Sequence, residues 1–116
     1  MVLLNSDQNI LYMVVSGTLR NKDFDQISSL VHSAVREYGK IRLYYEMNQF
    51  KGWTFRAFWR DLYLDLKFRN KVEKIALLGD QKWEKWMADS IRPLSGAEVR
   101  FYPLSVRAEA KEWIEN

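Results

Sequence analysis

The spacing of hydrophobic positions changes along this chain, and the changes predict alternating strands and helices. Residues 2–4 and 10–17 are apolar runs separated by the polar stretch 5–9, a pattern typical of two strands joined in a hairpin. Residues 21–38 carry apolar side chains at helical spacing, with Asn21 as the predicted N-cap, and Gly39 follows as a C-terminal cap. The chain therefore opens with a hairpin and a helix.

The rest of the chain continues this alternation. Residues 40–47 alternate between two faces, as a strand does, and residues 54–69 form a predicted helix. Residues 75–78 are an unbroken apolar run, typical of a parallel strand covered on both faces. A short helix, a last strand and a closing helix follow. This order predicts one α/β domain over residues 1–116, with a mostly parallel sheet of βα units and an N-terminal antiparallel strand.

Composition narrows the class of protein. The hydrophobic share of 47% and the charged share of 28% are those of a globular chain. Without cysteine there is no disulfide, thiolate nucleophile or cysteine metal site, which fits the reducing cytoplasm. No apolar run approaches the about 20 residues that span a bilayer. We expect a cytoplasmic protein.

The charge is mild overall but locally concentrated. A net charge of +3 is too small to indicate nucleic-acid binding. Between Lys51 and Lys74, seven cations stand against three acids, so this segment carries +4 and the remainder −1. Three of the cations, Arg56, Arg60 and Lys67, follow one flank of the predicted helix at residues 54–69.

That predicted helix has two apolar faces, although docking on a sheet needs only one. The second face carries Trp53, Ala57, Leu64 and Phe68. The short helix that follows Asp80 supplies a counterpart with adaptable aromatic and thioether side chains, namely Trp83, Trp86 and Met87.

Two interpretations of these apolar faces stay open. In the first, the helices pack on each other and complete the core. In the second, they enclose a site for an apolar or amphipathic ligand or face a membrane surface. In the second case the cations Arg56, Arg60 and Lys67 attract an anionic headgroup, whereas in the first they form a solvated face.

Candidate catalytic groups are sparse. Glu46 and Asp80 lie near the carboxyl ends of two predicted parallel strands, where α/β sheets bind ligands. Asp80 is explained as a helix cap and Glu46 as an outward-facing strand residue. The glycines occur singly, so no phosphate-binding loop is present. We expect no catalytic site, no metal site and no cofactor.

Three stretches resemble the bacterial SpoIIAA-like family, which is related to STAS domains: GKIRL at residues 39–43, FKGWT at residues 50–54 and GDQKWEKW at residues 79–86. The resemblance implies a SpoIIAA-like α/β fold, distantly shared with CRAL-TRIO domains, and no particular activity. Sporulation regulators of this fold carry a phosphorylated serine at the start of the helix after the second βα strand. Residues 48–54 hold no serine here, and Thr54 is interpreted as a helix N-cap.

These observations lead to a functional hypothesis. CRAL-TRIO relatives hold lipids beneath a movable helix, so the resemblance favours a non-catalytic module that binds an amphipathic ligand between the second and third helices. A fatty acid or phospholipid is the expected class of ligand, with a peripheral position at an anionic membrane as one form of the hypothesis. The alternative is a STAS-type regulatory domain that binds a protein partner without the phosphorylated serine.

Overall fold

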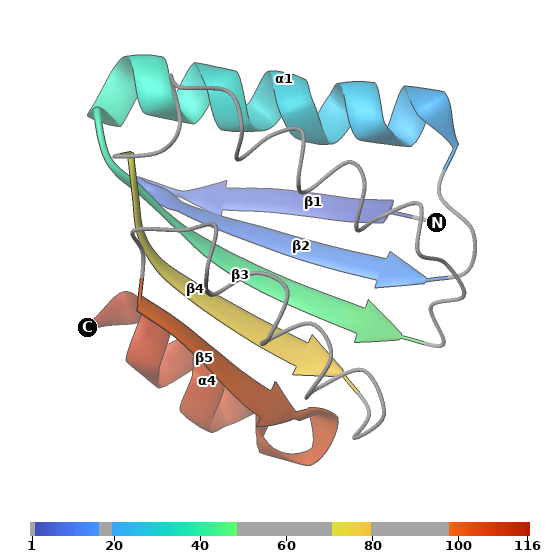
Figure 1. The fold of residues 1–116 in the computed structure, drawn as a ribbon, viewed down its shortest axis with the longest axis vertical. Coiled ribbons are helices and arrows are strands. Elements are labelled where there is room, and N and C mark those ends of the chain that lie inside the picture. Colours follow the sequence, from blue (N-terminus) through green and yellow to red (C-terminus); the bar gives the residue numbers. More distant parts are fainter. Residues whose placement is uncertain (1, 17–19, 49–70, 80–97) are drawn as a thin grey trace.

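The described residues form one mixed sheet with a helix on each face (Figure 1). The structure is a computed structural model and describes residues 2–16, 20–48, 71–79 and 98–116. The strands are β1 (Val2–Asp7), β2 (Ile10–Ser16), β3 (Ile41–Asn48), β4 (Val72–Gly79) and β5 (Glu98–Pro103), and they are ordered β1-β2-β3-β4-β5 across the sheet. β1 is antiparallel to β2, and all other pairs are parallel. The predicted fold class is confirmed.

The N-terminal hairpin closes through a two-residue turn. Asp7 pairs with Ile10, and Gln8 between them has a φ of 54°. A positive φ at the first turn position suits the right-handed twist of the flanking strands. β1 extends three residues beyond the predicted run 2–4, because the ladder to β2 also includes the polar residues 5–7.

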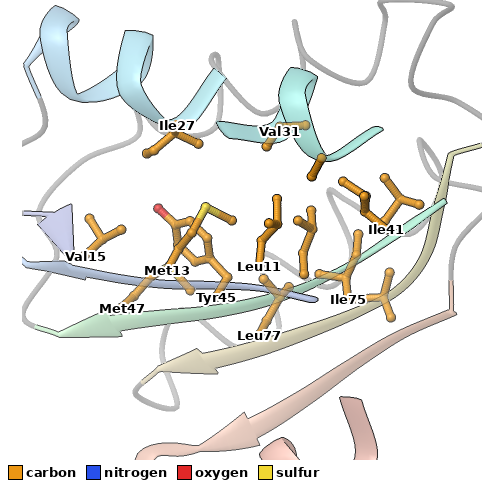
Figure 2. Packing of buried hydrophobic residues seen from close by; sticks show 14 residues of the cluster. Leu11, Met13, Val15, Ile27, Val31, Ile41, Tyr45, Met47, Ile75 and Leu77 are labelled. Atoms are coloured by element: carbon orange, nitrogen blue, oxygen red, sulfur yellow. The ribbon is translucent and has the colours of Figure 1, made fainter. Parts of the chain in front are cut away.

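Two helices cover opposite faces of the sheet (Figure 1). They are α1 (Asn21–Tyr38) and α4 (Arg107–Glu115), the latter preceded by the 3-10 turn η2 (Leu104–Val106). Side chains alternate between the faces along each strand. The larger cluster lies between the sheet and α1 (Figure 2) and includes Leu11, Met13, Ile27, Val31, Ile41, Tyr45, Ile75 and Leu77. The smaller cluster lies beneath α4 and comprises Ile10, Tyr44, Ala76, Leu78, Ala110 and Ile114.

The start of α1 differs by one residue from the predicted cap. Arg20 is the N-cap and Asn21 the first helical residue. The Asp23 carboxylate accepts a hydrogen bond from the Arg20 N–H at 2.9 Å. A carboxylate in the first turn also interacts favourably with the positive end of the helix dipole.

Two glycines offer a matched test of backbone strain. Gly39 ends α1 with φ 82° and ψ −55°, a conformation that side chains disfavour, and its N–H donates to the Val35 carbonyl oxygen at 2.8 Å. A Cβ at Gly39 meets no atom within 4 Å, whereas one at Gly79 makes ordinary contacts with Met47 and Phe101.

We expect Gly39→Ala to lower the free energy of unfolding by about 1–2 kcal/mol through backbone strain alone. Gly79→Ala should change it by less than about 0.5 kcal/mol, and urea denaturation of both variants checks the difference. Equal losses would contradict the strain argument.

Candidate functional site: a groove beside α4

The site predicted from the sequence lies outside the described residues. This applies to the apolar set Trp53, Ala57, Leu64, Phe68, Trp83, Trp86 and Met87, and to the cationic flank Arg56, Arg60 and Lys67. It applies equally to Thr54 and Asp80. Their proposed roles stay predictions.

Within the described residues, a groove of 490 Å³ lies between the N-terminal hairpin and α4. Tyr12 and Val14 of β2 line it together with Tyr44 and Glu46 of β3, while β1 contributes Leu3, Leu4 and Asn5. The sheet register places Tyr12 beside Tyr44 and Val14 beside Glu46. Leu3, which is 56% exposed, lies opposite Val14 at the outer end of this row. The floor is therefore aromatic and aliphatic, with one carboxylate.

The opposite wall of the groove is charged. Arg107, Lys111 and Glu115 line it, and their four-residue spacing places them along one side of α4. Ala110 and Ile114 of the same helix are fully buried against the sheet. Docking of these two small and aliphatic residues thus directs the charged side of α4 toward the hairpin.

Glu46 is buried, which corrects the prediction of an outward-facing residue. Its alternation in β3 was predicted correctly, but α4 covers that face and leaves Glu46 only 5% exposed. Its Oε1 accepts hydrogen bonds from the Tyr44 hydroxyl at 2.9 Å and from Arg107 Nε at 2.8 Å. A buried carboxylate needs such donors, because burial without them costs several kcal/mol, on the order of the desolvation penalty of an ion.

Arg107 is held in place by this contact. It is the first residue of α4, and its side chain is 47% exposed. The hydrogen bond to Glu46 raises the pKa of the guanidinium above its ordinary value, so the group is permanently charged. Because Glu46 bonds to Nε, both Nη groups stay available to a ligand as far as the described residues are concerned.

The two tyrosines of the floor are protonated hydrogen-bond donors. Their rings lie 5.4 Å apart at 50°. Burial raises the pKa of Tyr12 to about 12, assisted by its hydrogen bond to Glu115 at 3.2 Å. Burial likewise raises the pKa of Tyr44, assisted by its bond to Glu46. Lys111 Nζ lies 5.9 Å from the centre of the Tyr44 ring, within cation–π range.

Opposite charges lie at the two ends of the groove. The groove has a cationic end at Arg107 and Lys111 and an acidic end at Glu115, with an apolar floor between them. The described residues contain no group of three or more side chains suited to hold a metal ion. The sequence does carry a signal for this site, namely the four-residue spacing of Arg107, Lys111 and Glu115. The spacing alone does not show that these residues line a groove, because that depends on where α4 docks on the sheet.

None of the described helices is both long and apolar enough to cross a bilayer.

Comparison with known proteins assigns the family. A search of the curated proteins finds no match. A similar solved structure is that of an uncharacterised protein of the DUF3478 family with a SpoIIAA-like fold, from Shewanella loihica PV-4. The TM-score is 0.69 at 20% sequence identity, and the match covers 98% of this chain and 92% of the other, which supports the fold. The SpoIIAA-like family model matches residues 10–115, and the chain therefore belongs to the SpoIIAA-like family.

Proposed function

We propose that this protein is a non-catalytic binding module and that the groove beside α4 takes an amphipathic anion. The observation that carries the proposal is the guanidinium of Arg107, fixed by the buried carboxylate of Glu46 at one end of an apolar floor. A cation restrained before binding loses less conformational freedom when a ligand arrives.

The groove has two parts of different chemistry. A carboxylate or phosphate group accepts hydrogen bonds from the Nη groups of Arg107 and from Lys111. The apolar portion of the ligand lies along Val14, Tyr12 and the exposed side chain of Leu3. The volume of 490 Å³ falls within the about 300–1,000 Å³ of small-molecule sites.

This proposal keeps the class of ligand that the sequence predicts, an amphipathic molecule, but places it in the groove beside α4 and not between the second and third helices. The amphipathic site between the second and third helices, its cationic flank and the peripheral membrane position stay predictions. The STAS-type alternative with a protein partner stays a prediction as well.

A series of probes that share one alkyl chain tests the proposal. We expect decanoate to shift the backbone amide signals of Val14, Tyr44 and Lys111 in a saturable way in ¹H–¹⁵N spectra. Decyltrimethylammonium, which carries the opposite charge, should bind at least about tenfold more weakly, because a charge-assisted hydrogen bond contributes about 1.5–3 kcal/mol. Acetate, which lacks the chain, should leave the signals unchanged. Equal binding of the anionic and cationic probes would rule out an anion site.

Three variants locate the anion contact. Arg107→Gln and Lys111→Gln should each weaken decanoate binding about tenfold or more. Lys111→Gln leaves the Glu46–Arg107 pair intact, so its effect does not arise from a disturbed fold. Arg100→Gln is the matched control, because Arg100 lies on the other flank of α4, with its guanidinium 4.9 Å from the Trp113 ring. If Arg100→Gln weakens decanoate binding as much as the other two variants, the net positive charge of the protein attracts the anion, and specific contacts in the groove do not.

A further inference from the structure

The outer edge of β1 offers a second binding surface, independent of the groove. β1 is the terminal strand of the sheet, and none of the described strands pairs with its outer side. Exposed strand edges promote pairing with other chains, and proteins protect them with lysine, proline, bulges or very short strands. β1 has six residues with the sequence VLLNSD, and its register with β2 runs without a bulge. These protective features are absent from β1.

The hairpin geometry identifies the backbone groups of β1 that point away from β2. A two-residue turn closes on a hydrogen-bonded pair, here Asp7 and Ile10, and such pairs recur at every second residue. The backbone groups of Val2, Leu4 and Ser6 are therefore directed away from β2. In agreement, the N–H of Ser6 donates to the side chain of its neighbour Asn5, at 2.9 Å from Oδ1.

On the side of the sheet that α1 covers, the groove flanking this edge is lined by uncharged side chains. A groove of 660 Å³ lies between β1 and α1, and its lining consists of Leu4, Asn5, Ser6, Gln26, Ser29, Leu30 and Ser33. No ionisable side chain occurs in this set, although 28% of the chain is charged. In a two-fold symmetric interface each patch meets its own copy, so a charged patch repels itself and an uncharged one does not.

From these observations we infer that β1 pairs antiparallel with β1 of a second copy of this chain, which joins the two sheets through their edges. Side chains that face each other across an antiparallel ladder lie on the same face of the sheet. The register that uses all outward groups then places Leu4 opposite Leu4 of the second copy and Val2 opposite Ser6. Three hydrogen-bonded pairs result, and each face of one sheet continues into the same face of the other.

The pairing also brings the two grooves beside α4 close together. In this register Leu3, which is 56% exposed in the single chain, lies opposite Asn5 of the second copy. Both residues line the groove of their own chain. The floors of the two grooves therefore meet at the two-fold axis, where each Leu3 lies beside an Asn5. The pairing itself does not rest on the proposed ligand.

Cysteine cross-linking tests the pairing and its register, because the chain has no cysteine of its own. Facing residues of a hydrogen-bonded antiparallel pair have Cα atoms about 5.5 Å apart, within the range of about 4.4–6.8 Å that a disulfide spans. We expect Leu4→Cys to form a covalent dimer on mild oxidation. Ser105→Cys, placed in an exposed turn at the opposite edge of the sheet, is the control and should cross-link at least about tenfold more slowly at the same concentration.

Sedimentation velocity of the unmodified chain gives the independent measurement. We expect a monomer–dimer equilibrium between about 1 and about 500 μM. Ser6→Pro removes an outward N–H without touching the ladder to β2, and Ser33→Glu introduces like charges into the uncharged flank. Each should weaken dimerisation about tenfold while circular dichroism stays unchanged.

Two outcomes would overturn the inference. One is a monomer at every concentration, with Leu4→Cys reacting no faster than Ser105→Cys. The other is a dimer that Ser6→Pro and Ser33→Glu leave intact, since the copies then meet through another surface.

Discussion

Replacement of Leu77 by alanine is expected to lower the free energy of unfolding by about 3–4 kcal/mol, a large part of the stability of a chain this size. Leu77 is fully buried and belongs to the cluster between the sheet and α1 (Figure 2). The substitution removes the transfer free energy of the deleted atoms and leaves a cavity. α1 spans eighteen residues and is connected to strands at both ends, so it cannot move far to fill the cavity.

Two other leucines provide matched controls. Leu78, the next residue, is also fully buried but faces α4, which has nine residues, half as many as α1. A shorter helix is held by fewer contacts and relaxes more easily into the cavity, so Leu78→Ala should cost about 2–3 kcal/mol. Leu3→Ala should cost less than about 0.5 kcal/mol, because that side chain is 56% exposed. Chemical denaturation of the three variants measures the series, and a loss at Leu3 equal to that at Leu77 would contradict the assigned core.

Alkaline pH is expected to destabilise the protein steeply. Burial raises the pKa of Tyr45 well above its ordinary value, and the pKa values of Tyr12 and Tyr44 are raised in the same direction. A tyrosine whose pKa is higher in the folded than in the unfolded state stabilises the fold fully below about pH 10. That contribution is lost as pH rises from about 10 through the folded pKa, by up to about 1.4 kcal/mol per pH unit for each tyrosine.

Tyr45→Phe isolates one of these contributions. The variant should lose stability with pH about one third less steeply than the unmodified protein between about pH 10 and pH 12. Val31→Ala is a suitable control, because it weakens the same cluster without removing a phenol. Urea denaturation at several pH values, with tyrosinate absorbance followed in parallel, gives both slopes. An unchanged slope in Tyr45→Phe would show that its burial does not contribute to alkaline unfolding.

The described strands and helices follow from local pattern. Alternation in residues 40–47 correctly separated Tyr45 and Met47 from Tyr44 and Glu46, because side chains of a strand alternate whatever its neighbours are. The helical spacing of residues 21–38 and the glycine that follows predicted α1 to within one residue. The alternation of strands and helices also predicted the parallel pairs, because parallel neighbours need a crossover between them.

The candidate site depended on contacts that no local pattern contains. Glu46 meets Arg107 across 61 residues of sequence, and Tyr12 meets Glu115 across 103. The burial of Glu46 arises because α4 returns over the sheet face opposite α1 and brings its charged side to the hairpin. The sequence determined which face each strand residue occupies, through backbone geometry alone. Tertiary packing decided which of those faces is covered, and so which polar groups lie close enough together to form a site.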